Sequence, residues 1–387
     1  MLRHALLVAL VLGLAGCSTI KGWFAGDPEP GDPAELVEFA PTAETDELWS
    51  RDVGKGTDKR KQQLRPAYRD GTFWVADYKG RLTSVDASSG DVNWELKTDL
   101  PFSGGPGLSS ELVIMGTENG EIHAFQADTG TPLWIARVSS EVLAAPAVGD
   151  GIVVVRSIDG RVFGLDANNG RRIWVYDRSV PLLTLRGNAN PVIRAGIAYL
   201  GYDGGEVVAL RLQDGALLWE EPVATREGRT ELDRLADVDG QMVFVASDLL
   251  VSSYKNRLSS MAADSGRLLW FKDIPSSTGV TVARTNLAIS DREGNVWLLD
   301  RRNGATLWKQ DVLTNRGLTR PVFIDDYVVV GDAEGYLHWM DAEDGTFAAR
   351  TKVGGKGFTG APVVVGDTLF VYTRKGDLAA YRIESDA

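Results

Sequence analysis

Ala147 to Tyr176 reads AVGDGIVVVRSIDGRVFGLDANNGRRIWVY, and the fold can be predicted from the pattern of this segment. Residues 152–156 form a run rich in β-branched side chains, which favours a buried strand. Asp159-Gly160 is a pair typical of a two-residue hairpin, and a further turn precedes the Trp-containing segment 171–176. The stretch therefore predicts four short antiparallel strands, which is the pattern of one propeller blade.

The same pattern recurs along the chain with a Gly followed 14 residues later by a Trp. It runs Gly80 to Trp94, Gly120 to Trp134, Gly160 to Trp174, Gly205 to Trp219, Gly294 to Trp308, and Asn256 to Trp270 with Asn in place of Gly. Two further copies are incomplete: Gly335 leads to Ala349 where Trp is expected, and Gly376 starts a copy that the C-terminus cuts short. Repeats spaced by about 40 to 45 residues are typical of propeller blades.

The two ends of the repeat array complement each other. Glu47-Leu48-Trp49 resembles a fourth strand without its preceding three, whereas Pro362 to Ile383 resembles three strands without a fourth. An open array would leave two unpaired sheet edges. We therefore expect an all-β, eight-bladed propeller of four-stranded antiparallel blades over residues 46–387, in which the N-terminal strand completes the last blade. Seven blades with a loose terminal hairpin is the alternative.

The repeated Trp is expected to have a structural role. A large amphipathic ring at one place in each repeat packs best between neighbouring blades, with its indole N–H on a backbone acceptor. The repeat with Ala349 lacks this ring, and we expect Phe347 to take its place.

Charge and length exclude some classes of protein. The chain has 387 residues, with 53 acidic against 41 basic side chains and a formal net charge of -12. This acidity disfavours a nucleic-acid partner and electrostatic adsorption to anionic lipid. The length alone would suggest two or three domains, but a closed ring of repeats is one unit.

The N-terminus predicts export and lipidation. Residues 1–16 have a basic start, an apolar run too short to span a bilayer, and small residues at the end, as in a secretory signal peptide. Leu14-Ala15-Gly16-Cys17 resembles a bacterial lipoprotein signal, which implies an acylated Cys17. Ser18 follows, and the absence of Asp there implies sorting to the outer membrane, facing the periplasm. Residues 17–45 are expected to be the lipidated Cys and a flexible tether.

Signals for chemistry are few. His123 and His338 share one offset from the repeat Gly, so we expect equivalent strand positions in distant blades and no shared metal site. The segment Ala87 to Trp94, ASSGDVNW, resembles the tryptophan-docking repeat of pyrroloquinoline-quinone dehydrogenases, which are eight-bladed propellers. That resemblance implies an adjacent-cysteine disulfide, calcium and a catalytic Asp, but this chain has a single Cys. A quinone-dependent periplasmic dehydrogenase is kept as the alternative function, and we assign no catalytic, cofactor or metal residue.

Two consecutive connectors between blades are longer than the others. Trp174 and Pro191 are 17 residues apart and Trp219 and Met242 are 23 apart, where most connectors span 12 or 13. Insertions in repeat proteins tend to build one binding face. Because these connectors are consecutive, we expect them to be adjacent in space.

The contents of these connectors suggest an interface. The first holds Leu183, Leu185 and Arg186, and the second holds Asp237 and Asp239. Apolar anchors and Arg are favoured at interfaces, although the leucines could instead form a small core cluster under the loops. Each pair, the leucines and the acids, alternates along the chain and could face one way. The acids could hold Arg186 in place or meet a cation of a partner.

The lipoprotein signal, the Trp repeats and the motifs LLTLRG and ELDRLADVDG together resemble the BamB family of the β-barrel assembly machinery. The resemblance covers essentially the whole chain. It implies a non-enzymatic scaffold, monomeric within a hetero-complex, that binds the periplasmic domains of BamA and assists the assembly of outer-membrane proteins. It also implies that the five connector residues contact BamA. Capture of unfolded outer-membrane proteins by strand addition at a blade edge is a second possible function, and no edge is marked in the sequence.

Overall fold

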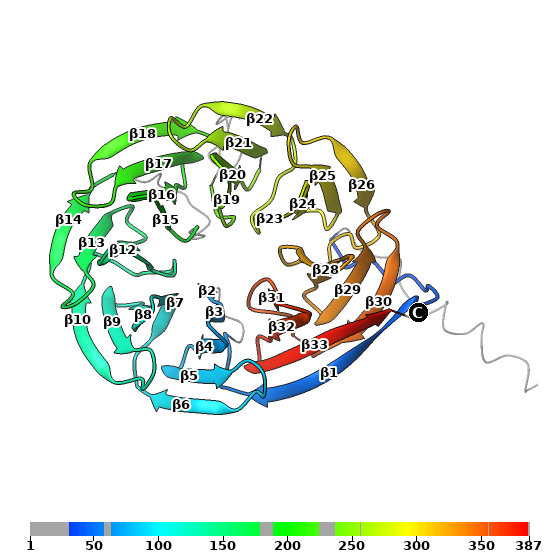
Figure 1. Ribbon diagram of the computed structural model, residues 1–387, viewed down its shortest axis with the longest axis horizontal. Coiled ribbons are helices and arrows are strands. Elements are labelled where there is room, and N and C mark those ends of the chain that lie inside the picture. The colour runs from blue at the N-terminus through cyan, green and yellow to red at the C-terminus, as the bar shows by residue number, and fades with distance from the viewer. Residues whose placement is uncertain are drawn as a thin grey trace, which may run out of the picture.

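The structure is a computed structural model that describes residues 31–57, 63–178, 189–223, 237–255, 257–354 and 356–385. Its strands form eight sheets arranged in a ring (Figure 1). In blade order they are β3 (Ala67–Arg69), β4 (Thr72–Ala76), β5 (Arg81–Asp86), β6 (Val92–Lys97); β7 (Phe102–Leu108), β8 (Leu112–Thr117), β9 (Glu121–Gln126), β10 (Pro132–Arg137); β11 (Ala147–Gly149), β12 (Ile152–Arg156), β13 (Val162–Asp166), β14 (Arg172–Tyr176); β15 (Val192–Arg194), β16 (Ile197–Gly201), β17 (Glu206–Arg211), β18 (Leu217–Pro222); β19 (Val243–Val245), β20 (Asp248–Ser252), β21 (Leu258–Ala262), β22 (Leu268–Lys272); β23 (Val280–Ala283), β24 (Asn286–Ser290), β25 (Val296–Asp300), β26 (Thr306–Gln310); β27 (Val322–Ile324), β28 (Tyr327–Gly331), β29 (Tyr336–Asp341), β30 (Phe347–Lys352); and β31 (Val363–Val365), β32 (Thr368–Tyr372), β33 (Asp377–Ser385), β1 (Ala43–Asp52).

These sheets, taken in that order as blades 1 to 8, are antiparallel, with the first-named strand nearest the ring axis and the last on the circumference. Blade 2 carries an additional short strand, β2 (Gln63–Leu64), which runs parallel to β7 at the inner rim. The predicted all-β, eight-bladed propeller is confirmed.

The β-branched runs are explained by burial on both faces of each blade. In β12, Val154 belongs to a core cluster shared with blade 4, whereas Val153 and Val155 belong to one shared with blade 2. A strand sandwiched between two neighbours needs apolar side chains at every position, so its sequence does not alternate. The cores of this propeller therefore lie between blades, and the strand pattern VVV follows from that.

The repeated Trp joins each blade to the next, as predicted. Trp94 donates its indole N–H to the carbonyl of Ala127 at 2.9 Å, and it lies over Gly130, where an added Cβ would be 2.7 Å from Trp94 Cε3. The same N–H donation to the next blade is made by Trp49, Trp134, Trp174, Trp219 and Trp308. Trp270 lies in the same way over Gly304.

The ring is closed by strands from both ends of the described chain. β1 pairs antiparallel with β33, from Ala43 opposite Ser385 to Asp52 opposite Asp377, and Figure 1 shows the two strands side by side on the outer rim. Trp49 then donates its N–H to Ala87 of blade 1 at 3.2 Å. The predicted closure is confirmed, with the first strand beginning at Ala43, three residues before the expected start of the propeller.

The expectation that Phe347 replaces the missing Trp of blade 7 is wrong. Phe347 faces blade 6, and its ring is tilted against that of Phe39 and edge-on to that of His338. The compensating ring is Trp339, which is fully buried in the core between blades 7 and 8 and pairs directly with Ala349 across the two strands. In the other blades the residue paired with the Trp is mostly small: Ser84, Ala124, Gly164, Ala209, Ser260, Leu298 and Ala380.

The last part of the expected tether is bound to the propeller. Arg316 donates to the carbonyl of Ala34 at 2.7 Å, Arg350 donates to the carbonyl of Val37 at 3.0 Å, and Phe39 packs on Phe347. The prediction of a free tether up to residue 45 is therefore wrong for these residues. The expected signal peptide and Cys17 lie outside the described residues. Within the part that is described, no helix is long and apolar enough to cross a membrane.

Candidate functional site

The predicted site residues fall into two groups. Leu183, Leu185 and Arg186 lie outside the residues that the structure describes. Asp237 and Asp239 are described, and they are 0% and 7% exposed. Two acidic side chains near the end of a connector would ordinarily be solvated, so their burial calls for a local explanation.

The backbone at the end of the second connector buries these acids. Val238 donates its N–H to the carbonyl of Tyr202 at 3.1 Å, which ties the connector to blade 4. The Val238 side chain occupies the space over Gly201, where an added Cβ would be 2.4 Å from Val238 Cγ1. Because side chains alternate along an extended segment, Asp237 and Asp239 turn away from Val238. The predicted alternation places both carboxylates in one group.

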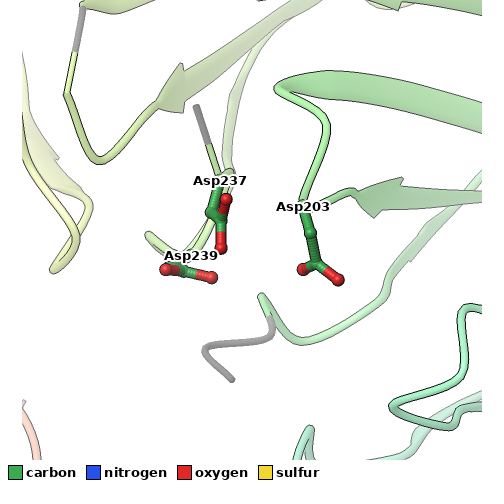
Figure 2. Close-up of side chains that lie close together, drawn as sticks. All are labelled: Asp203, Asp237 and Asp239. Atoms are coloured by element: carbon green, nitrogen blue, oxygen red, sulfur yellow. The ribbon is translucent and has the colours of Figure 1, made fainter. Parts of the chain in front are cut away.

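A third carboxylate joins them. Asp203 lies on the turn between β16 and β17, and one carboxylate oxygen from each of the three aspartates lies within 4.8 Å of the others. Figure 2 shows Asp203 on a separate segment, across from Asp237 and Asp239. The acidic group is thus assembled from blade 4 and from the connector into blade 5.

One buried Arg partly balances this charge. Arg156, at the end of β12, is 1% exposed, and its Nη2 donates to Asp203 at 3.0 Å. Its guanidinium also lies over the ring of Tyr202, 4.6 Å from the centroid, and Arg178 lies over the same ring at 4.7 Å. Since Arg178 begins the first long connector and Val238 ends the second, Tyr202 contacts the described ends of both.

Among the described residues, this group brings three carboxylates together and Arg156 donates a hydrogen bond to one of them. Burial, then the neighbouring carboxylates of Asp237 and Asp203, raises the pKa of Asp239 to about 7, although Arg156 and Arg65 act in the opposite direction. Asp239 Oδ1 is buried without a hydrogen-bond partner. Buried charge is costly unless it is paired. The arrangement is therefore suited to receive a further positive group.

Several positive groups fit such a site. Three carboxylates are the oxygen ligands that a hard divalent cation prefers. They are equally the acceptors that a guanidinium or an ammonium group needs. Arg156 already takes one oxygen of Asp203. A second positive side chain, from the first connector or from a partner, would extend the same pattern of charge-assisted hydrogen bonds.

The sequence reasoning missed Asp203, Arg156 and Tyr202, although the repeat holds a signal for two of them. Tyr202 stands three residues before the repeat Gly, where the other repeats have Asp77, Thr117, Ser157, Ser253, Asp291, Asp332 and Thr373. Arg156 belongs to the preceding repeat and stands four residues before its Gly160. At that position most repeats have a small residue: Ala76, Gly116, Gly201, Ser252, Ser290 and Gly331. Breaks in the repeat at these two positions mark the site.

The two histidines do occupy equivalent positions. His123 pairs with Ile135 in blade 2, and His338 pairs with Arg350 in blade 7. His338 is fully buried, with its Nε2 at 3.0 Å from Asp332 Oδ2, and its burial lowers its pKa. These contacts belong to the group that holds the N-terminal segment on blade 7.

Comparison with known proteins identifies the family. A family model described as outer membrane protein assembly factor BamB matches residues 79–310 and 298–386. The chain belongs to the BamB family. A BamB of Pseudomonas aeruginosa is 45% identical over 381 residues, covering 98% of this chain and 99% of its own. A BamB of Xanthomonas campestris is 42% identical over 395 residues, covering 98% and 97%.

Solved structures agree with this family. The crystal structure of BamB from Moraxella catarrhalis matches with a TM-score of 0.80 at 27% identity, over 88% of this chain and all of that one. A europium-containing methanol dehydrogenase matches with a TM-score of 0.71 at 12% identity, over 87% of this chain and 93% of that one. At that identity the likeness to the dehydrogenase shows the propeller fold alone.

Proposed function

We propose that this protein is an outer-membrane protein assembly factor: a non-enzymatic scaffold that binds the periplasmic domains of BamA and assists insertion of β-barrel proteins. The names of its full-length relatives support this function. The proposal includes an anchor of acyl chains on Cys17, at the periplasmic face of the outer membrane of a Gram-negative bacterium. The observation that carries the partner site is the buried group of Asp203, Asp237 and Asp239 beside the two long connectors.

The binding site combines apolar anchors with charge. Burial of Leu183 and Leu185 against the partner would contribute about 1.5–3 kcal/mol each. Arg186 has the planar fork that binds a carboxylate with two hydrogen bonds. Asp237 and Asp239 supply a buried negative group at the described end of the second connector. A site of this composition would be specific, because an unpaired buried charge disfavours the wrong partner.

A binding measurement tests the site. The mature protein should bind the purified periplasmic region of BamA, and Leu183→Ala with Arg186→Ala should weaken that binding at least about 100-fold, which corresponds to the loss of roughly 2.7 kcal/mol. The matched control is Leu217→Ala with Arg211→Ala, which removes the same residue types from exposed positions of blade 4. Unchanged affinity in the first variant, with an unchanged melting temperature, would refute the site.

A double-mutant cycle separates the two roles open to the acids. Asp239→Asn and Arg186→Ala are measured singly and together for BamA affinity. If Asp239 holds Arg186 in place, the two losses will not add, because each change disrupts the same unit. If Asp239 meets a cation of BamA, the losses will add.

The non-enzymatic part of the proposal has its own test. Incubation with pyrroloquinoline quinone and calcium should produce no dye-linked alcohol oxidation above that of the quinone alone. Activity that saturates with added quinone would support the dehydrogenase alternative.

Capture of unfolded β-barrel strands belongs to the same proposal as a second role. The outer strand β10 offers an edge for strand addition, with Leu133 and Ile135 exposed by 49% and 65%. Exposed apolar side chains beside free backbone groups are what an unfolded apolar strand would pair with.

A further inference from the structure

A pocket of about 240 Å³ lies at the inner ends of blades 6, 7 and 8, with Arg65 of blade 1 in its lining. Its lining includes Arg65, Arg320 and Arg374, together with the hydroxyl-bearing Ser277, Thr278 and Thr359. A basic pocket is unexpected in a chain with a net charge of -12. This concentration of positive charge needs a local reason.

Two of the arginines occupy the same position of the repeat. Arg65 and Arg320 each precede the Pro that opens an inner strand, in blades 1 and 7. The other residues that precede such a Pro are uncharged: Gly105, Ala145, Asn190 and Ala361. Blades 1 and 7 flank blade 8 in the ring (Figure 1). The two arginines line one pocket together with the small Gly360 and Ala361 of blade 8.

Blade 8 is shaped to admit the Arg65 side chain. A Cβ added at Gly360 would be 2.9 Å from Arg65 Cγ and 3.1 Å from its Cδ. Any side chain at Gly360 would therefore push Arg65 out of its place. The glycine allows the stem of Arg65 to cross the backbone of blade 8 and reach the pocket.

No carboxylate is among the described residues that line the pocket with Arg65 and Arg320. Arg320 Nη1 donates to neutral acceptors, the carbonyl of Val280 at 3.3 Å and Thr281 Oγ1 at 3.2 Å. Burial lowers the pKa of Arg320 to about 10, and the like charge of Arg65 acts in the same direction. Arg65 Nε is buried without a hydrogen-bond partner. Burial lowers the pKa of Arg65, and Asp239 outside the pocket lining is near enough to act in the opposite direction, but it is already one of three crowded carboxylates.

We infer that this pocket binds a small oxyanion of the phosphate or carboxylate class between the guanidinium groups of Arg65 and Arg320. Guanidinium groups bind the oxygens of such anions with paired, charge-assisted hydrogen bonds. The volume suits one phosphate-sized group and not a folded partner. The bound anion would remove the repulsion between the two arginines and fix the inner ends of blades 1 and 7 around blade 8.

Calorimetric titration of the mature protein with inorganic phosphate tests this site, at constant ionic strength set with sodium chloride. We expect saturable binding of one phosphate per chain and a melting temperature that rises with phosphate concentration. Arg65→Gln with Arg320→Gln should weaken phosphate at least about tenfold. Arg171→Gln with Arg267→Gln removes two exposed charges elsewhere and should leave the affinity unchanged.

Further arms identify the source of the anion and guard against a folding defect. Glycerol 3-phosphate tests a lipid headgroup, and acetate tests a carboxylate. Tighter binding of one of these than of phosphate would name the natural class. Arg320→Lys keeps the positive charge but removes the planar guanidinium, which can make two hydrogen bonds to one anion. This variant should bind phosphate more weakly while melting at the wild-type temperature. Absence of saturable binding of all three anions, or equal affinity in the Arg65/Arg320 variant, would overturn the inference. BamA affinity is not a readout, so this result is independent of the proposed function.

Discussion

Asp239 shows how a single residue can be placed at a cost to stability. Its carboxylate is 7% exposed and lies in one group with Asp203 and Asp237. Its pKa is about 7 in the folded protein and near 3.8 in the unfolded chain. At pH values between these two, the folded protein holds a proton on Asp239 and the unfolded chain releases it. Retention of such a group is understandable if a positive group of a partner or of the first connector completes it.

Asp239→Asn should therefore stabilise the free protein in a pH-dependent way. Between about pH 4 and pH 7 the unfolded chain is ionised at this position while the folded protein is still protonated, so wild-type stability falls as the pH rises through this window. Asn cannot ionise. We expect the variant to be more stable by about 2–4 kcal/mol at pH 8, with the gain shrinking toward pH 5.

Urea unfolding at pH 5 and pH 8 measures this difference. The control is Asp128→Asn, which changes an exposed acid of blade 2. An equal gain at both pH values would show that the raised pKa of Asp239 is not the cause.

At the scale of elements, the join between blades depends on a Trp and a Gly. Gly130 has a φ of +69° and lies under Trp94, which reaches across from blade 1. Blade 7 lacks this Trp, and the strand connections of blade 8 explain why. A Trp at position 349 would lie over a turn between the two outer strands of blade 8, but those strands, β33 and β1, are not joined by a turn. Trp339, on the neighbouring strand, fills the core instead.

A pair of glycine substitutions isolates this contact. Gly151 has a similar φ of +75° but nothing within 4 Å of an added Cβ. Gly151→Ala should cost about 1–2 kcal/mol, the penalty for a left-handed backbone. Gly130→Ala should cost about 1–3 kcal/mol more, because its Cβ displaces Trp94. Urea unfolding followed by Trp fluorescence provides both values, and equal losses would contradict a role for the contact between Trp94 and Gly130.

At the scale of the whole molecule, stability depends on closure of the ring. β1 covers the outer edge of β33, and Trp49 joins blade 8 to blade 1. The segment before β1 contributes less, since it adds a few hydrogen bonds from Arg316 and Arg350 and one aromatic contact. Removal of each part should therefore have different consequences.

Two shortened chains compare these contributions. A chain that begins at Thr42 keeps β1 and should melt cooperatively within a few degrees of the mature protein. A chain that begins at Val53 lacks β1, exposes the edge of β33, and should melt at a much lower temperature or self-associate. Calorimetry and light scattering distinguish the outcomes. A monomeric, equally stable chain starting at Val53 would show that the ring does not need this strand.

Much of the fold could be predicted because its contacts repeat. Six of the repeated Trp residues, Trp94 among them, donate a hydrogen bond to a carbonyl of the next blade. The single spacing from Gly80 to Trp94 therefore encodes both the strands and their neighbours. The departure from the repeat in blade 7 could not be predicted in this way. Nothing local to Ala349 shows that Trp339 fills the gap, because that depends on which strands of blade 8 are joined.

The candidate site was predictable only in part. Asp237 and Asp239 stand out in an overlong connector, but their burial depends on Val238 seated over Gly201 of the preceding blade. Arg156 comes from yet another blade.

The number of blades, their strand order and the strand that closes the ring could all be predicted from the amino-acid sequence. Those features arise from contacts between neighbours at a constant spacing, and a spacing can be read along a chain. The meeting of Asp203 with Asp237 and Asp239, and of Arg65 with Arg320 in one pocket, became evident from the folded ring. The ring brings residues of different blades together around one axis. Charged side chains that are far apart in the sequence become neighbours there, and the spacing of the repeats does not reveal which ones meet.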